Sequence, residues 1–432
     1  MIWLLYNLLF LCGFLLLLPR FLWRMARRGG YTRHFMQRFG CYAPGLRAQF
    51  GTGRIWIHGV SVGEVMVALR FMDALRAADP AARFILSTNT STGHALAARR
   101  LLPRDVLIYF PLDLPWIVRR VLDRLQPRLL LLVECELWPN LLRAAHIRGL
   151  PVALVNGRLS ARSHAGYRRG RFFTRRFLPW LECACMQSPA DAERLCDLGA
   201  PPGRVHVVGS MKYEESPPDA AACAQSARCL AQAGFAGRRL LLAGSTWPGE
   251  EEILLDLYLA LRAAHPDLAL GLAPRHVERC PALLRLLPRP DLTFVARSNS
   301  ETAPRPERPD VFLLDTTGEL LAFYAQAEFV FVGKSLAAAH GGQNPIEPAL
   351  CGRPAVVGPH MENFQAVVAE LLDAGALCQV ADAAALCAQV AAWLADPAAA
   401  AAQGARARSF IAAQAGATAR TLARLPCHSR PD

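Results

Sequence analysis

The sequence predicts an α/β protein in which two Rossmann-like domains face a central cleft, preceded by an N-terminal transmembrane anchor helix. Three observations lead to this fold class. Short, uninterrupted apolar runs alternate with amphipathic stretches over residues 54–155, and a second series of the same kind covers residues 240–357. Continuous apolar strands separated by helices are typical of parallel sheets that are covered on both faces. The chain of 432 residues is long enough for two such domains, and its first 18 residues carry no charge.

The first element is the apolar segment MIWLLYNLLFLCGFLLLL, from Met1 to Leu18. A helix of this length crosses a bilayer, or nearly so. A cleaved signal peptide would carry its positive charge before the apolar run and end in a small-residue site, and neither feature is present. Basic flanks stay on the cytoplasmic side, so the pattern predicts a single-pass anchor over residues 1–24 with a cytoplasmic body. The basic flank consists of Arg20, Arg24, Arg27 and Arg28.

The other elements define the domain boundaries. In the first half, apolar runs predict strands at residues 54–57, 83–88, 107–110, 129–133 and 152–155. In the second half they predict strands at residues 240–243, 268–272, 311–314, 329–332 and 355–357. The stretch between the two series begins with ESPPD and becomes rich in alanine, which is typical of a connector. We therefore expect an N-terminal domain at 30–214, a connector at 215–237 and a C-terminal domain at 238–425.

The net charge and the cysteine content indicate which classes of partner and which redox environment fit this chain. The formal charge of +13 and the pI near 9.5 favour an anionic partner such as a nucleic acid, an anionic lipid or a phosphorylated substrate. The thirteen cysteines are scattered and odd in number, and the closest pair, Cys183 and Cys185, has no second pair at metal-ligand spacing. This usage indicates reduced thiols of a cytosolic domain and disfavours disulfides and structural zinc.

Glu64 stands between an apolar strand and an apolar helix. The strand is RIWI at 54–57, a small polar turn covers 58–63, and Val65, Ala68 and Leu69 begin a helical repeat. Glu64 is therefore expected at the carboxyl end of a strand, where open α/β sheets bind ligands. Taken alone, this position favours a purely structural role, because acidic residues favour the first turn of a helix.

Small residues also follow the predicted strands of the second half. The groups are GST at 244–246, PRH at 274–276, DTTGEL at 315–320 and GGQNPIEP at 341–348. Paired glycines allow close approach of a ligand, and backbone donors at the start of a helix suit a phosphate. Since equivalent strand ends lie at one edge of a sheet, the series predicts a nucleotide site. Neither a GxGxxG nor a P-loop motif is present, so neither NAD nor ATP is favoured.

Taken together, these motifs resemble those of the 3-deoxy-D-manno-octulosonic acid (Kdo) transferases of lipopolysaccharide biosynthesis, which are glycosyltransferases of the GT-B fold. The resemblance covers nearly the whole chain, including the anchor. The motifs that carry it, in chain order, are HGVSVGE (58–64), ECELWPN (134–140), NGRLSARS (156–163), VGSMK (208–212), PRH (274–276), DTTGEL (315–320) and GGQNPIEP (341–348).

The resemblance implies transfer of Kdo from CMP-Kdo to the tetra-acylated, bisphosphorylated lipid A precursor (lipid IVA) at the inner membrane. It implies that Glu64 is the general base, which takes a proton from the attacking hydroxyl. We expect the helix N-terminus to keep this carboxylate ionised. Glu134 and Lys212 are implied to stabilise the transition state, in which positive charge develops on the sugar and CMP leaves as an anion. A structural ion pair between Glu134 and Lys212 is the alternative.

The resemblance also implies that the domain at 30–214 binds the acceptor and that the domain at 238–425 binds the CMP-sugar. It implies no cofactor besides the donor substrate CMP-Kdo, and no metal. The sequence departs from the family's usual residues at Trp247, Gly157, Lys334 and Gln343, where histidine, alanine, glycine and histidine are common; we expect altered donor affinity from Gln343. The implied CMP contacts are Pro274, Arg275, Thr317, Gly318, Glu319, Asn344, Pro345, Ile346 and Glu347.

A basic segment in the N-terminal half is a candidate for membrane and acceptor contacts. Residues 164–177 interleave five arginines, between Arg168 and Arg176, with three phenylalanines. Such a pattern suits an anionic membrane surface and lipid phosphates. An RNA-binding patch would have a similar composition, but the anchor and the lack of a nucleic-acid-binding motif argue against nucleic acid as a partner. A solvated helix face is the structural alternative.

Two other functions remain consistent with the fold. A nucleotide-sugar epimerase or hydrolase could use the same two-domain frame, although it would need neither an anchor nor a basic, lipid-facing segment. A catalytically silent, membrane-tethered binding module would not need Glu64, Glu134 and Lys212 together.

Overall fold

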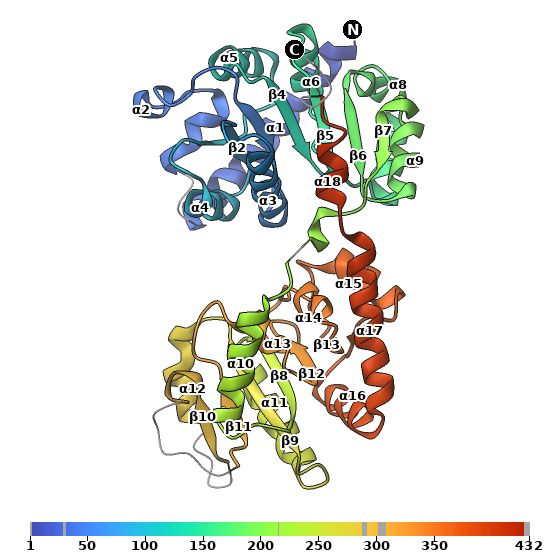
Figure 1. The fold of residues 1–432 in the computed structure, drawn as a ribbon. Helices are drawn as coiled ribbons and strands as arrows, with labels where there is room; N and C mark the ends of the chain where they lie inside the picture. The colour runs from blue at the N-terminus through green and yellow to red at the C-terminus, as the bar shows by residue number, and fades with distance from the viewer. Residues whose placement is uncertain (1, 29–31, 215, 287–291, 301–307, 427–432) are drawn as a thin grey trace. The chain divides into compact units, whose positions relative to one another are not determined.

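The structure is a computed structural model that describes residues 2–28, 32–214, 216–286, 292–300 and 308–426. The chain forms two compact units (Figure 1). Unit 1 comprises Met1–Glu214 and Gly416–Asp432, and unit 2 comprises Glu215–Ala415. Several predicted boundaries lie outside the described residues: Met1 of the anchor, residues 30 and 31 of the N-terminal domain, and Glu215 of the connector.

Unit 1 is built on a parallel sheet. Over its described residues, seven strands lie in the order β3-β2-β1-β4-β5-β6-β7. In β1, Trp56 packs into the core on one face while Ile55 and Ile57 pack into the core on the other. Burial on both faces explains why these strands are apolar along most of their length, and the predicted parallel α/β fold is confirmed. The strands are β1 (Ile55–His58), β2 (Phe84–Thr88), β3 (Val106–Tyr109), β4 (Leu129–Val133), β5 (Val152–Gly157), β6 (Cys183–Met186) and β7 (Val205–Val207).

Helices connect these strands and cover the sheet. Among them, α3 shows why the chain turns helical after β1: the Ser61 hydroxyl accepts a hydrogen bond from the Glu64 N–H, and the Glu64 carboxylate accepts one from the Ser61 N–H. The helices described in unit 1 are α1 (Ile2–Arg28), α2 (Pro44–Arg47), α3 (Val62–Ala78), α4 (Ser91–Arg100), α5 (Pro115–Leu125), α6 (Pro139–Ile147), α7 (Ala161–Arg169), α8 (Arg171–Thr174), α9 (Pro189–Asp197) and α18 (Ala417–Leu422).

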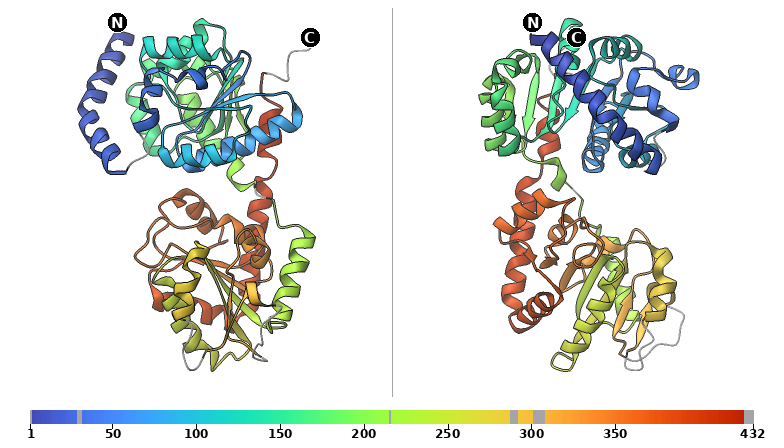
Figure 2. Two further views of the ribbon diagram at one scale, coloured as in Figure 1. Left: turned by 90° about the vertical axis from the view of Figure 1, so that its left-hand side faces the viewer. Right: turned by 180° about the vertical axis from the view of Figure 1, so that it is seen from behind.

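The N-terminal helix α1 lies along one side of unit 1 (Figure 2). Trp3 stacks on Trp180, with ring centroids 5.9 Å apart, and the Tyr6 hydroxyl donates a hydrogen bond to Asp113 at 2.8 Å. Within the described chain, α1 is the single helix that is long and apolar enough to cross a membrane unaided, over Ile2–Pro19. It is therefore a candidate membrane anchor, as the sequence predicts.

Unit 2 repeats the design of unit 1. Its described residues form a second parallel sheet of seven strands, in the order β10-β11-β9-β8-β12-β13-β14. The strands are β8 (Arg239–Thr246), β9 (Leu268–Pro274), β10 (Phe294–Ala296), β11 (Val311–Leu313), β12 (Phe329–Val332), β13 (Ala355–Val357) and β14 (Cys378–Gln379). The helices described here are α10 (Ala220–Gln232), α11 (Glu250–Arg262), α12 (Cys280–Leu286), α13 (Leu320–Tyr324), α14 (Ile346–Leu350), α15 (Gln365–Asp373), α16 (Ala383–Ala395) and α17 (Pro397–Gln414).

The unit boundaries differ from the predicted domain boundaries in two places. Most of the predicted connector is helix α10, which belongs to unit 2 and is joined to it by a hydrogen bond from the Ser226 hydroxyl to the Ala322 carbonyl. The predicted C-terminal domain runs to residue 425, but α18 belongs to unit 1. Ala417 is buried in the unit 1 core, and the Thr418 N–H donates to the Glu214 carboxylate at 3.0 Å.

Candidate functional site

The order of the strands in unit 1 creates a switch point between β1 and β4. The chain adds β2 and β3 on one side of β1 and then places β4 on the other side. Open α/β sheets bind ligands outside the carboxyl ends of their strands at such a point. Glu64 follows β1 in the first turn of α3, and Glu134 follows β4 directly. The topology therefore brings two of the predicted catalytic residues to one edge of the sheet.

Glu64 is 9% exposed, and both of its carboxylate oxygens accept backbone hydrogen bonds. The Val60 N–H donates at 2.8 Å and the Ser61 N–H at 3.3 Å. Burial nevertheless raises the pKa of Glu64 above the usual glutamate value, and the negative charges of Glu134 and Glu136 raise it further. The backbone donors at the helix N-terminus lower the pKa, as expected, but desolvation is the larger effect, so the net shift is upward. A raised pKa is typical of a proton-transfer group.

Glu134 and Lys212 form a close ion pair. The Lys212 ammonium nitrogen lies 2.5 Å from the Glu134 Oε1, and both side chains are partly exposed. Glu134 has a φ of 60°, a left-handed conformation that is uncommon for a residue with a side chain. Its N–H is held by the Val155 carbonyl at 3.0 Å, which fixes the carboxylate at the end of β4. The structure thus brings Glu134 and Lys212 together, as both the catalytic and the structural interpretation require.

Asn156 is a part of this site whose role the sequence analysis missed. It is fully buried, has a φ of 53°, and its Oδ1 accepts the N–H of Met211 at 2.9 Å. The Gln187 side chain in turn donates to the Asn156 carbonyl at 2.8 Å. Asn156 therefore fixes the short 3₁₀ turn Met211–Tyr213, from which Lys212 reaches Glu134. The available signal was a polar residue at the end of the apolar run at 152–155.

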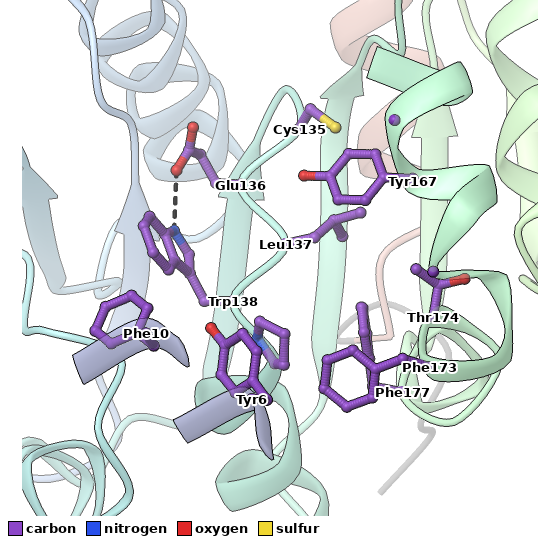
Figure 3. Close-up of a pocket in the computed structure, with 13 residues that line it drawn as sticks. Tyr6, Phe10, Cys135, Glu136, Leu137, Trp138, Tyr167, Phe173, Thr174 and Phe177 are labelled. Carbon is purple, nitrogen blue, oxygen red and sulfur yellow. Dashed lines mark hydrogen bonds between the residues drawn. The ribbon is translucent and has the colours of Figure 1, made fainter. Parts of the chain in front are cut away.

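A cavity of about 450 Å³ opens beside the residues that follow Glu134. Figure 3 shows Tyr6 and Phe10 of α1 among the lining residues together with Phe173 and Phe177, and the Tyr6 ring packs against Phe173 with ring centroids 5.4 Å apart. Glu136 lies at the cavity wall and accepts a hydrogen bond from the Trp138 indole at 2.9 Å. The cavity is thus lined mainly by aromatic side chains, with a carboxylate at the wall next to the catalytic candidates.

The predicted basic segment forms α7, α8 and the turn that follows. Arg168, Arg169 and Arg175 are exposed, so they present positive charge to the surroundings. Arg171 has a structural partner instead, because its guanidinium lies 3.1 Å from the Asp197 carboxylate. The His164 imidazole also contacts Asp197, at 2.9 Å. The segment therefore combines a solvated helix face with contacts to one carboxylate, and its proposed role in acceptor binding stays a prediction.

Unit 2 has its own switch point, between β8 and β12. Gly333, directly after β12, has no room for a side chain, because a Cβ there would lie 2.5 Å from the Ser245 carbonyl oxygen. The buried Glu250, at the start of α11, accepts hydrogen bonds from the backbone N–H groups of Lys334, Ser335 and Leu336 at 2.8, 2.8 and 3.1 Å. Glu250 thus fixes the loop after β12, a role that the sequence analysis did not assign to it.

The predicted CMP contacts lie at the same sheet edge. Pro274 ends β9, and Arg275, directly after it, is exposed. Glu319 accepts hydrogen bonds from Thr316 and from Arg297, the latter at 3.3 Å. The remaining members follow β11 and β12: Thr317 and Gly318 are exposed, Asn344 donates to Glu347 at 3.2 Å, and Pro345 precedes Ile346 at the start of α14.

Two departures from the family's usual residues contact each other. The Lys334 ammonium lies 4.8 Å from the centre of the Trp247 ring, a cation–π contact. Lys334 has a φ of 60°, which explains in physical terms why a glycine is common at this position. The two residues that depart from the family's usual ones, Lys334 and Trp247, therefore interact directly.

One group of described side chains has the chemistry of a metal site. The potential ligand atoms of His340, His360 and Glu362 lie within 4.8 Å of one another at the surface of unit 2. The expectation that the protein needs no metal stays a prediction.

Comparisons with known proteins place this geometry in context. The family model described as 3-deoxy-D-manno-octulosonic-acid transferase (kdotransferase) matches residues 33–215. The 3-deoxy-D-manno-octulosonic acid transferase of Bordetella pertussis is 36% identical over 416 residues, covering 93% of this chain and 94% of that protein. Among solved structures, the C-terminal CMP-Kdo-binding domain of an Acinetobacter baumannii protein is 30% identical and covers 45% of this chain and 99% of that one, with a TM-score of 0.42. The UDP-GlcNAc 2-epimerase of Neisseria meningitidis, at 11% identity and a TM-score of 0.51, covers 86% of this chain and 99% of its own, and shares the fold alone.

Proposed function

The chain belongs to the 3-deoxy-D-manno-octulosonic acid (Kdo) transferase family, and from this premise we propose that it transfers Kdo from CMP-Kdo to lipid IVA with inversion at the anomeric carbon. The fold is that of a GT-B glycosyltransferase. The observation that carries the proposal is the arrangement of Glu64, Glu134 and Lys212: two carboxylates follow neighbouring strands at a switch point, and the ammonium group contacts one of them.

In the proposed reaction, Glu64 takes the proton of the acceptor hydroxyl while the hydroxyl oxygen bonds to the anomeric carbon of Kdo. The bond between that carbon and the phosphate oxygen breaks, and its electron pair leaves with CMP. Glu64 is suited to this step because burial raises its pKa and two backbone donors fix its carboxylate. Glu134 and Lys212 would stabilise the positive charge on the sugar and the negative charge on the phosphate, respectively.

We assign the donor to unit 2. The loops after β9, β11 and β12 converge on one sheet edge and supply an exposed arginine, exposed backbone at 317–318 and the Asn344–Glu347 pair. An arginine suits the single phosphate of CMP as a charge-assisted donor, and a carboxylate suits the hydroxyls of the ribose. The donor contacts proposed are Pro274, Arg275, Thr317, Gly318, Glu319, Asn344, Pro345, Ile346 and Glu347.

We place the body on the cytoplasmic side of the inner membrane, with α1 as its anchor. The basic flank after the apolar segment favours the anionic cytoplasmic face of the membrane, whether or not α1 spans the bilayer. In a single-pass arrangement, Trp3 and Tyr6 would lie at the far end of the helix from the body. Their contacts with Trp180 and Asp113 instead favour a helix that lies in the cytoplasmic leaflet. An Ile2→Cys variant tests this, because a membrane-impermeant thiol reagent added to spheroplasts would label it only in the single-pass arrangement.

A nucleotide-sugar epimerase or hydrolase is the alternative, and the shared fold of the Neisseria epimerase does not separate the two. The separating experiment is a mass-spectrometric assay with CMP-Kdo and lipid IVA. A mass increase of one or more Kdo units supports the transferase, whereas conversion or hydrolysis of the nucleotide sugar without transfer supports the alternative.

The same assay tests Glu64 with two variants. Glu64→Gln keeps an oxygen for the capping box but cannot act as a base, whereas Glu64→Ala loses both functions. We expect both variants to lose transfer, and Glu64→Ala to lose more thermal stability than Glu64→Gln, which keeps one of the two backbone hydrogen bonds. An active Glu64→Gln would reduce Glu64 to a helix cap.

A further inference from the structure

We propose that the aromatic cavity between α1 and the α7–α8 segment binds one acyl chain of the lipid acceptor, and that α1 is a wall of this site as well as an anchor. The inference rests on the proposed function, since it identifies how that site recognises a lipid. It gives the N-terminal helix a direct part in substrate recognition.

Specific contacts hold α1 in this position. In addition to the hydrogen bond from Tyr6 to Asp113, the Asn140 side chain donates to the Asn7 Oδ1 at 2.8 Å. The Arg143 guanidinium lies 4.8 Å from the centre of the Trp3 ring. Polar side chains at fixed positions of an apolar helix are matched by polar partners on the body. Such matching would serve no purpose in a helix that acted only as a tether, so α1 is part of the folded unit.

The lining of the cavity suits a hydrocarbon chain. Its volume of about 450 Å³ lies within the range of roughly 300–1,000 Å³ that is typical of small-molecule sites. Six aromatic rings line the wall, and three of its polar groups have partners in the protein. The Thr174 hydroxyl donates to the Leu198 carbonyl at 2.7 Å, the Tyr6 hydroxyl donates to Asp113, and the Glu136 carboxylate accepts from the Trp138 indole. The Tyr167 hydroxyl also belongs to the lining. A sugar or a nucleotide would need several polar partners inside the cavity, whereas an acyl chain needs none.

The surroundings connect the cavity to the membrane on one side and to the reaction on the other. The face of α1 away from the body carries exposed leucines, including Leu4, Leu8 and Leu16, which are 74%, 57% and 80% exposed. These leucines would face the lipid of the leaflet, on the same helix that contributes Tyr6 and Phe10 to the cavity. At the opposite side, Cys135 and Glu136 line the wall and follow Glu134 directly in the chain. A chain bound here would hold the acceptor next to the proposed catalytic residues.

The first test fills the cavity. Gly166 lines it, and a Cβ at this position meets no atom within 4 Å, so Gly166→Trp adds volume without a backbone clash. Gly45→Trp is the matched control, because Gly45 also has open space around its Cβ but lies outside the cavity. We expect Gly166→Trp to raise the KM for lipid IVA roughly tenfold or more, since a few buried methylene groups carry that much affinity. Its KM for the fully deacylated form of the same acceptor should not change.

The second test removes the wall that α1 contributes. Phe10→Ala should raise the KM for lipid IVA, while Leu9→Ala, on the exposed face of the same helix, should not. Equal effects of Phe10→Ala and Leu9→Ala, or an equal loss with the acylated and deacylated acceptors, would overturn the proposal.

A binding measurement separates this proposal from the proposed function. The probe is phosphatidic acid with a diazirine on one acyl chain, in phosphatidylethanolamine vesicles. We expect crosslinks within residues 2–19 and 166–177, lost in Gly166→Trp and kept in Gly45→Trp. If these crosslinks form but the wild type transfers Kdo to neither acceptor, the transferase assignment fails and the acyl-chain site stands. If transfer occurs and crosslinks map elsewhere, the acyl-chain site fails alone.

Discussion

The Lys212 ammonium nitrogen lies 2.5 Å from the Glu134 carboxylate, and both residues are held there by their backbones. Glu134 adopts a left-handed conformation at the end of β4, and the residue before Lys212 is hydrogen-bonded to Asn156. Two constrained loops from different strands therefore meet in one ion pair. A surface ion pair formed by chance would not require an unfavourable φ on one partner.

The first prediction concerns the two charges of this pair. We expect Glu134→Gln and Lys212→Met each to lower kcat by roughly a hundredfold or more, the scale for loss of one transition-state-stabilising group. A partly exposed structural pair contributes only about 0–1 kcal/mol to stability. If the pair is only structural, both variants should thus retain nearly normal turnover. Steady-state kinetics with CMP-Kdo and lipid IVA, alongside a CMP-binding titration, distinguishes the two interpretations.

Asn156 provides the second prediction, because its hydrogen bond and its conformation can be separated. Asn156→Ala loses the acceptor for the Met211 N–H and keeps a side chain at positive φ, whereas Asn156→Gly loses only the acceptor. Both variants should lose most of the Kdo-transfer activity, since Lys212 is no longer positioned. Asn156→Ala should be the less stable of the two by about 1 kcal/mol. Urea unfolding and kcat measurements test this, and a fully active Asn156→Gly would remove Asn156 from the site.

Sequence alone was sufficient for the elements and for part of the site. The sheets were predictable because strands buried on both faces must be apolar throughout, and Glu64 stood out as a charge between such a strand and a helix. The roles of Asn156 and Glu250 were not predictable, since they depend on N–H groups 55 and 84–86 residues further along the chain. The sequence also did not predict that α18 belongs to unit 1. The alanine-rich composition continues through residue 415, and the break occurs at Gly416, where φ is 84°.

The third prediction is a pH dependence. Glu64 must be ionised to accept a proton, so transfer should fall as the pH drops through its raised pKa. The Glu136→Gln variant removes a negative charge that raises this pKa, so the acidic limb of the kcat/KM profile should move to lower pH. An acidic limb that stays in place would mean that another group controls it.

The raised pKa of Glu64 also makes the free energy of unfolding depend on pH, because proton binding is linked to folding. The folded state has the higher pKa and binds more protons, so the contribution of Glu64 to stability is present below its unfolded pKa and is lost as the pH rises through the folded value. Glu64→Gln stays neutral, and its unfolding free energy should lack this decline.

The Lys334–Trp247 pair gives the fourth prediction. Lys334→Gly loses the cation–π contact but relieves the left-handed backbone, whereas Lys334→Ala loses the contact and keeps the strain. We expect Lys334→Ala to be less stable than Lys334→Gly by about 1 kcal/mol, measured by urea unfolding. In a Trp247→His background, substitution of Lys334 should no longer cost the free energy of the cation–π contact. The alanine and glycine variants should then differ in unfolding free energy only through the strain of the left-handed backbone. Equal stabilities of the alanine and glycine variants would show that the loop relaxes to another conformation.

The last prediction concerns the arginines of α7 and α8, which differ in their contacts. Arg168 and Arg169 are exposed, while Arg171 pairs with Asp197 at 3.1 Å. Neutralising all three would therefore change acceptor binding and protein stability at the same time. We therefore expect the double variant Arg168→Gln/Arg169→Gln to have a higher KM for bisphosphorylated lipid IVA than the wild type. This difference in KM should be smaller at high salt, because exposed charges are screened. Binding of CMP should not change. Arg171→Gln serves as the comparison, since loss of its ion pair should lower thermal stability slightly. If the double variant uses lipid IVA as well as the wild type does at low salt, the exposed arginines are a solvated helix face.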